Sequence, residues 1–93
     1  MALPDVPELV DALGRAQAAS GENNQAMSSF NKLVGLMPTS PLPYLRMATV
    51  HVAAKDNSAA ITSLRKALDA QPNLLAAQRG LAELLLKTNQ ASE

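Results

Sequence analysis

The chain has 93 residues, of which 47% are apolar and 2% aromatic, and its eight basic residues balance its eight acidic ones. A chain of this length forms one small domain with a thin core, and its abundant Ala and Leu, with few aromatic or β-branched residues, predict an all-α fold. The charge balance argues against nucleic-acid binding, and the lack of cysteine excludes disulfides and thiolate metal sites.

The apolar segments of the chain are short. The longest uninterrupted runs have about five residues, as in 33–37, whereas a helix needs roughly 20 to span a bilayer. We therefore expect no direct membrane insertion. No basic segment followed by an apolar one opens the chain, so we also expect no signal peptide.

A first helix is predicted to begin at Asp5-Val6-Pro7-Glu8, because Asp5 and Glu8 can form a capping box around a proline that needs no hydrogen-bond partner. Spacing at i, i+3, i+4 and i+7 predicts a buried face. This face consists of Val10, Leu13, Gly14 and Gln17. Gly21 is expected to end the helix in the left-handed conformation.

A second helix is predicted after Asn23 or Asn24, either of which can act as its N-cap. Its predicted buried residues are Ala26, Met27, Phe30, Leu33 and Val34. Two prolines in the segment 37–41 interrupt the helical pattern, and Ser40-Pro41 begins a third helix. The predicted buried face of the third helix consists of Tyr44, Met47, Ala48 and His51.

A fourth helix is predicted to follow the cap Asp56-Asn57 and to stop at Gln71-Pro72. Its predicted buried residues are Ala60, Ile61, Leu64, Ala67 and Leu68. Asn73 is expected to cap a fifth helix with Leu81, Ala82 and Leu85 on its core face. The polar tail from Lys87 onward is expected to fray.

The helices recur with a fixed 34-residue period. This distance separates Ala26 from Ala60, Phe30 from Leu64, and Pro38 from Pro72. The same translation relates Leu13, Met47 and Leu81, and also Gly14, Ala48 and Ala82. Agreement at so many positions predicts an internal repeat rather than independent helices.

This pattern resembles the tetratricopeptide repeat (TPR), which has a 34-residue period and a W-x2-L-G-x2-Y, A-x3-F, P signature. The resemblance implies a right-handed α-α superhelix, a solenoid of about two and a half helix-turn-helix repeats with five helices. Repeat one would be 7–40, repeat two 41–74, a half repeat 75–88 and a polar tail 89–93, together a fragment of a longer repeat protein. The departures from the family pattern are Gln17, Leu33, Lys55 and Gln78.

The runs PLPYLRMATVHVAAKD and SLRKALDAQPNLLAAQRGLAEL also resemble the bacterial TPR lipoproteins of exosortase and exopolysaccharide loci. This narrower resemblance implies a periplasmic or membrane-anchored parent protein.

Residues that could carry catalysis have simpler interpretations. His51 has no serine or acidic residue at helical spacing, so we interpret it as a packing residue rather than a catalytic base. Glu8 and Asp11 could be a carboxylate pair for acid–base chemistry or a metal, but Arg15 at i+4 from Asp11 favours a surface ion pair. A similar ladder is predicted for Arg79, Glu83 and Lys87. We expect no enzyme activity, cofactor or metal.

In the tetratricopeptide family the first helix of each pair lines a concave groove, and the resemblance implies that a protein or peptide partner binds there. The predicted groove residues are Glu8, Asp11, Arg15, Leu42, Leu45, Arg46, Thr49, Val52, Arg79, Glu83 and Leu86. An apolar strip with a charged border suits a partner helix or an extended peptide. The alternative interpretation is that these leucines are ordinary exposed apolar residues.

A carboxylate clamp, which some family members use to hold a peptide terminus, is not expected here. Asp11 would repel a carboxylate, and Ala76 and Gly80 have no side chain that donates. The sequence thus predicts a non-catalytic protein-interaction scaffold. The alternative is a structural spacer whose partners are the neighbouring repeats of a longer solenoid, with weak self-association through the last helix, because that helix is apolar on several faces.

Overall fold

The computed structural model describes residues 6–88 of the chain. This part contains five α-helices, namely α1 (Pro7–Ala19), α2 (Asn23–Leu36), α3 (Leu42–Ala53), α4 (Asn57–Ala70) and α5 (Leu75–Lys87). The predicted all-α, five-helix architecture is confirmed. Asp5 and the polar tail 89–93 lie outside the described residues.

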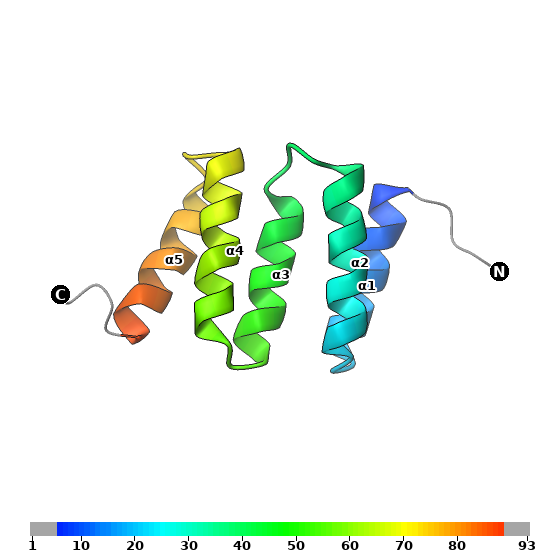
Figure 1. Cartoon of the computed structure of the whole chain (residues 1–93), viewed down its shortest axis with the longest axis horizontal. Helices are drawn as coiled ribbons and strands as arrows, with labels where there is room; N and C mark the ends of the chain where they lie inside the picture. Colours follow the sequence, from blue (N-terminus) through cyan, green and yellow to red (C-terminus); the bar gives the residue numbers. More distant parts are fainter. Residues whose placement is uncertain (1–5, 89–93) are drawn as a thin grey trace.

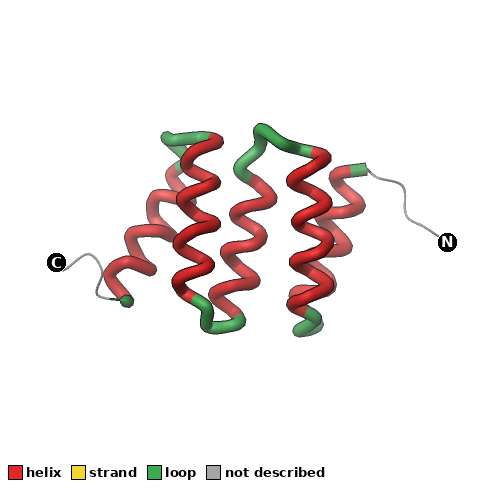
Figure 2. The backbone as a smooth tube through the Cα atoms, in the orientation of Figure 1, coloured by secondary structure: helices red, strands yellow, loops and turns green. Residues whose placement is uncertain are grey.

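The helices stand side by side in chain order, and the connecting loops alternate between the top and the bottom of the row as drawn (Figures 1 and 2). Contacts are most extensive within the pairs α1–α2 and α3–α4, while α2 packs on α3 and α4 packs on α5. The row measures 51 × 27 × 15 Å. This flat, elongated shape, in which each helix contacts mainly its sequence neighbours, is typical of an α-solenoid.

Two turns that lie one repeat period apart have the same geometry. Gly21 has a φ of 80° and Lys55 a φ of 63°, so both residues adopt the left-handed conformation. The Glu22 N–H donates to the Gln17 carbonyl at 2.9 Å, and the Asp56 N–H donates to the His51 carbonyl at 2.8 Å. These bonds satisfy carbonyl groups that the helix end would otherwise leave without partners. The left-handed turn predicted at Gly21 therefore recurs at Lys55.

The helix N-termini differ from the predicted caps at several points. Asp56 does cap α4, since its side chain accepts from the Ala59 N–H at 3.2 Å. The N-cap of α2 is Glu22 rather than an asparagine. The Glu22 N–H is bonded to the Gln17 carbonyl of α1, and this bond places Glu22 directly before Asn23, the first residue of α2.

At α1 and α5 the cap positions are held by Val6 and Leu74, and neither helix start has a side-chain cap. The prediction that Asn73 caps α5 is wrong. The Gln78 side chain, in the first turn of α5, instead donates a hydrogen bond to the Pro72 carbonyl at 2.8 Å. This bond holds the loop between α4 and α5 against the start of α5.

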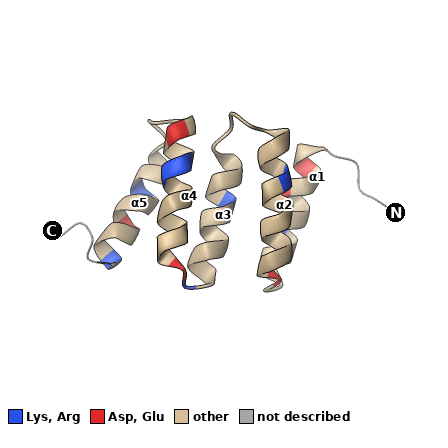
Figure 3. Ribbon diagram, viewed as in Figure 1, with Lys and Arg blue, Asp and Glu red and all other residues tan. Residues whose placement is uncertain are grey.

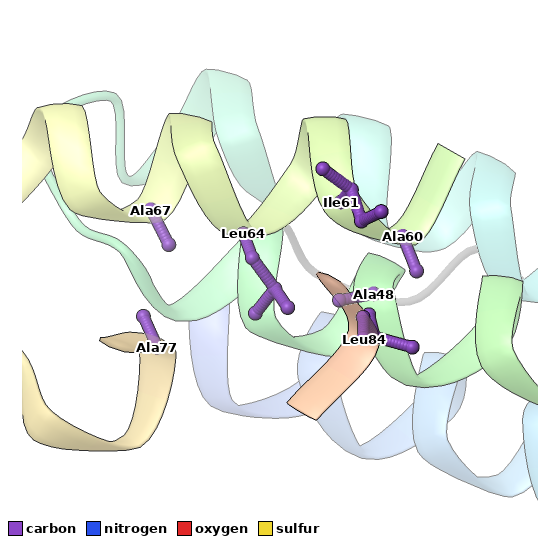
Figure 4. Close-up of a cluster of buried hydrophobic side chains, with 7 residues drawn as sticks. All are labelled: Ala48, Ala60, Ile61, Leu64, Ala67, Ala77 and Leu84. Carbon is purple, nitrogen blue, oxygen red and sulfur yellow. The ribbon is translucent and has the colours of Figure 1, made fainter. Parts of the chain in front are cut away.

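The core consists of two clusters that follow each other along the row. The first contains Val10, Ala26, Phe30, Leu33, Met47 and Val50. The second contains Ala48, Ala60, Ile61, Leu64, Ala67, Ala77 and Leu84 (Figure 4). In Figure 4 Ala67 and Ala77 point toward each other from α4 and α5, so small residues bring these two helices close.

The phenyl ring of Phe30 packs directly on Gly14. A Cβ placed on Gly14 would lie only 2.8 Å from Cδ1 of this ring. The equivalent pair one repeat later is Ala48 with Leu64. Ala48 is slightly larger than Gly14, and Leu64 is smaller than Phe30. The two pairs thus fill similar space with different residues, as the 34-residue period predicts.

Some predicted core positions are not buried. Leu13 is 39% exposed, although Met47, its 34-residue translate, is only 6% exposed. Met47 packs in the cluster of α2 residues, whereas no helix precedes α1 within the described residues. Ala82 is exposed and Leu81 half-buried, while α5 buries Ala77 and Leu84 instead. The other predicted core residues that are only half-buried are Gln17, Met27, Val34, Tyr44, His51, Leu68 and Leu85.

Candidate protein-binding cleft

A cleft of about 680 Å³ lies between α3 and α5, with α4 at its base. Its lining consists of Leu45, Ala48, Thr49, Val52 and Ala53 from α3, Leu64 from α4, and Ala76, Gly80, Glu83, Leu84 and Lys87 from α5. We call this site the α3–α5 cleft. Ala48, Leu64 and Leu84 are buried core residues that form its apolar floor.

Helical spacing places the lining residues on facing sides of α3 and α5. Leu45, Thr49 and Val52 occur at i, i+4 and i+7 of α3. Ala76 and Gly80 are one turn apart on α5, and their small size leaves the space open. A Cβ on Gly80 would lie 3.4 Å from Leu64 Cδ1, so this glycine stands directly over the floor.

The predicted groove residues are divided between two hollows. Leu45, Thr49, Val52 and Glu83 line the α3–α5 cleft. Glu8, Asp11 and Leu42 line a smaller hollow of about 260 Å³ together with Pro7 and Met37. The remaining four, which line neither hollow, are Arg15, Arg46, Arg79 and Leu86. Leu86 is 68% exposed and lies on another face of α5.

Asp11 forms a charged network that joins the first and second helix pairs. Arg46 Nε and Nη2 donate to Asp11 Oδ1 and Oδ2 at 2.8 and 3.1 Å, a two-point contact between α3 and α1. Arg15 Nε lies 3.2 Å from Asp11 Oδ2, so the i, i+4 ion pair predicted on α1 is also formed. Asp11 is 8% exposed. Arg46, one of the predicted groove residues, therefore forms an ion pair within the protein, while its side chain remains 33% exposed.

This bridge had a signal in the repeat. Translation by one repeat period places Asp11 at the position of Leu45, directly before Arg46. An acid and a base at adjacent repeat positions of neighbouring first helices can reach each other across the groove. Ion-pair spacing within one helix does not reveal this contact, because its two partners lie on different helices.

The ladder predicted on α5 is not formed. Within residues 6–88, Glu83 has an ion pair with neither Arg79 nor Lys87. Glu83 and Lys87 thus border the α3–α5 cleft with charges of opposite sign that are unpaired within this range. Figure 3 shows basic and acidic residues scattered over the helices in this view, with no basic stripe. Lys87, Leu64 and Ala53 are lining residues that the sequence analysis did not assign to the groove.

Among the residues considered for catalysis, Glu8 and Asp11 line the smaller hollow and His51 lines neither hollow. His51 is half-buried in the last turn of α3. The described part of the chain holds no group of three or more His, Cys, Asp or Glu residues placed to bind a metal ion. None of its helices has the length and apolar character to cross a membrane.

Comparison with known proteins agrees with this geometry. Residues 43–74, which include most of α3 and all of α4, match the tetratricopeptide repeat family. The chain is also similar to DnaJ homolog subfamily C member 3 of Bos taurus, with 32% identity over 81 residues, 87% of this chain and 16% of that protein. It therefore spans about a sixth of this curated relative.

Neither match supports the narrower resemblance to bacterial lipoproteins of exosortase loci. The repeat match coincides with the helix pair that has neighbours on both sides, and the other helices continue the same arrangement. Together, these findings identify residues 43–74 as a tetratricopeptide repeat, in a chain whose described helices follow the same helix-turn-helix arrangement.

Proposed function

We propose that this chain is a non-catalytic interaction scaffold that binds a partner peptide or helix in the α3–α5 cleft. Tetratricopeptide repeats generally mediate protein–protein interactions, and solenoids use extended concave surfaces for this purpose. The observation that carries the proposal is the cleft itself, about 680 Å³ of largely apolar space between two first helices of successive pairs.

The shape and lining of the cleft favour an apolar side chain from the partner. Its floor of Ala48, Leu64 and Leu84 offers no side-chain hydrogen-bonding group. An amphipathic helix or an extended segment that inserts one or two apolar residues would bury both surfaces. The polar side chains of the lining are Thr49, Glu83 and Lys87.

The charged border is suited to orient the partner. Glu83 and Lys87 lie one turn apart on α5 and have no ion pair within the described residues. Opposite charges on a partner would fix its direction and speed its association, and contribute less to affinity because these side chains are exposed.

Arg46 has an intramolecular contact in addition to its predicted place in the groove. Since both its Nε and Nη2 contact Asp11, replacing it would alter the junction of α1 and α3 as well as any contact with a partner. Arg46 is better described as a residue that positions the wall of the groove. A test of partner binding therefore requires other substitutions.

The cleft is best tested by filling it. Gly80→Leu adds a side chain over Leu64, and its Cβ would lie at an ordinary van der Waals distance from Leu64. Leucine also favours a helix more than glycine does, so α5 should form at least as well as before. We would select binders from a displayed library of random peptides against the unmodified chain. The expected result is that selected peptides carry apolar anchors and lose about tenfold or more in affinity for Gly80→Leu.

A matched pair of variants separates the cleft from general surface changes. Val52→Glu adds a charge at a cleft residue that is 41% exposed, and Leu13→Glu adds the same charge at a residue on α1 that is 39% exposed. Binding should fall for the first variant and stay unchanged for the second. If the selected peptides bound all three variants equally well, the cleft would not be the binding site.

A second candidate function is a spacer or self-associating segment inside a longer solenoid. In this view repeat one (7–40), repeat two (41–74) and the half repeat (75–88) connect neighbouring repeats of a parent chain, for example a chain that serves in bacterial exopolysaccharide assembly. Leu75 and Leu86, which are 62% and 68% exposed on α5, favour a covered interface there. Under this function Gly80→Leu and Val52→Glu would leave assembly of the parent protein intact.

A further inference from the structure

The α3–α5 cleft lies where the ion pair of the neighbouring junction has no counterpart. Asp11 of α1 and Arg46 of α3 bridge the first two helix pairs. Their 34-residue translates are Leu45 and Gly80, which cannot form such a bridge because Leu45 has no charge and Gly80 has no side chain. The hollow that Asp11 lines has about 260 Å³, whereas the cleft between Leu45 and Gly80 has about 680 Å³. A wider and more apolar space therefore accompanies the loss of the charged pair.

The two ends of this cleft differ in chemistry. Apart from the floor residue Leu84, the lining residues of α5 are Ala76, Gly80, Glu83 and Lys87. The first two leave an apolar end near the start of α5, and the last two form a charged end near its finish. From Ala76 to Lys87 the helix rises by roughly 16.5 Å. A ligand that reaches both ends must therefore be elongated.

We infer that the α3–α5 cleft binds an amphipathic helix that lies antiparallel to α5, and this inference rests on the proposed function of the cleft. In the chain order of the partner, the facing side chains are acidic, basic, apolar and apolar, at positions i, i+4, i+7 and i+11. A helix repeats the spacing of α5 residue for residue. In an extended segment the side chains of one face recur about every 6.6 Å, so four of them span roughly 20 Å and drift out of step with the lining.

The predicted order of side chains follows from charge and apolar complementarity. The acidic residue faces Lys87 and the basic residue faces Glu83, and neither of these two has an ion pair within residues 6–88. The two apolar residues lie over Gly80 and Ala76, above the buried side chain of Leu64. Apolar contact then supplies most of the affinity, while the exposed charges select the order and direction of the partner.

Helix dipoles favour the antiparallel direction. Both α3 and α5 run from the top to the bottom of Figure 1, so their carboxyl ends lie at the charged end of the cleft. The free carbonyl groups there carry partial negative charge and attract the positive amino end of an antiparallel helix. The acidic residue of that helix lies near its amino end and precedes the basic residue by four positions, and both features stabilise a helix. A parallel helix would reverse all of these contributions.

The test uses two synthetic alanine-based peptides of about 18 residues with blocked ends, a length that supports helix formation. The first peptide carries Glu, Lys, Leu and Leu at positions i, i+4, i+7 and i+11, and the second has Glu and Lys exchanged. Each is titrated into the isotope-labelled chain and followed by NMR. We expect saturable amide shifts at Thr49 and Gly80 with the first peptide, and about fivefold weaker binding of the second, because two exposed attractive pairs become repulsive.

A spin label reports the direction of the bound helix. With a nitroxide at the amino end of the first peptide, amide signals near Lys87 should broaden more than those near Ala76. The label at the carboxyl end should give the opposite pattern.

A protein with exchanged charges tests the pairing itself. Glu83→Lys combined with Lys87→Glu keeps the net charge, and it should reverse the preference so that the second peptide binds about fivefold more tightly than the first. The matched control is Arg65→Asp combined with Asp69→Arg, an exposed i, i+4 pair on α4 outside the cleft lining. This control should keep the original preference. Circular dichroism of both variants checks that the fold is retained.

Four results would overturn the inference. Neither peptide could give saturable shifts, both could bind the unmodified chain equally well, the amino-end label could broaden signals near Ala76 most, or the charge exchange could leave the preference as it was. The cleft proposal is judged separately by the library-selected peptides. It stands if they lose affinity for Gly80→Leu, even where the designed helices fail, and it falls if they do not.

Discussion

Helices α3 and α5 occupy equivalent positions in successive repeats, yet they are held very differently. α3 has α2 on one side and α4 on the other, and it buries Pro43, Met47, Ala48 and Val50. α5 packs mainly on α4 among the described helices and buries only Ala77 and Leu84. Their repeat positions match, so the difference shows that burial in a solenoid is decided by neighbours more than by the helix itself.

The sharpest way to break this comparison is to place one charge at both equivalent positions. Ala48 is 4% exposed, so Ala48→Arg should destabilise the chain by about 4 kcal/mol or more, enough to unfold it. Ala82→Arg should change the free energy of unfolding by less than about 0.5 kcal/mol. Urea unfolding followed by circular dichroism measures both. Equal effects would mean that α5 is as enclosed as α3.

A smaller effect is expected from the charged contact that ties α3 to α1. Arg46→Ala leaves the nearly buried Asp11 with only the exposed Arg15 as partner, and should cost about 1–2 kcal/mol, less than a fully buried pair because the Arg46 side chain is 33% exposed. Arg79→Ala on α5 should cost less than about 0.5 kcal/mol, since Arg79 is exposed and has no ion pair within residues 6–88.

Chemical denaturation at low and high salt checks this prediction. The difference between the Arg46 and Arg79 variants should shrink as salt rises, because salt weakens a partly exposed ion pair. If the two arginines cost the same at low salt, the bridge to Asp11 would not stabilise the junction of the helix pairs.

The smallest effect is expected at the turn that follows α3. Lys55 has a φ of 63° where the equivalent turn after α1 has a glycine, and a side chain in this conformation is strained. Lys55→Gly should therefore stabilise the α3–α4 pair by about 0.5–1 kcal/mol.

Hydrogen exchange can locate this gain. Protection should rise for amides of α3 and α4 and remain unchanged in α5, because α5 can open without them. Gly21→Ala is the control with the opposite sign, since Gly21 has a φ of 80° and an alanine there would be strained. A uniform rise along the chain would instead indicate a single cooperative unit that includes α5.

Much of the fold was predictable because its signals are local. The 34-residue period, the two-proline break and the left-handed turn at Gly21 each depend on a few neighbouring residues. These signals predicted the helix number and the approximate helix limits. The predicted caps at Asn23 or Asn24 and at Asn73 were wrong, because the turn before each helix, rather than the cap preference of one residue, determines where the helix begins.

The candidate site was predictable only in part. The resemblance to the tetratricopeptide repeat implied that Leu45, Thr49 and Val52 line a groove, and the α3–α5 cleft brings them together with Glu83. It did not predict that the groove divides into two hollows, which depends on the separation of α3 from α5. Nor did it predict that Arg46 reaches Asp11, a contact across 35 residues of sequence.

By itself the sequence determined the elements of this protein, since helix formation, turns and the repeat period are written in short-range patterns. Only the tertiary structure decided which faces are covered. Leu13 and Ala82 carry the core pattern but remain exposed, whereas Met47 and Ala48 at the same positions are buried. The physical reason is that burial requires an adjacent helix, and the helices at the two ends of the described row each lack one.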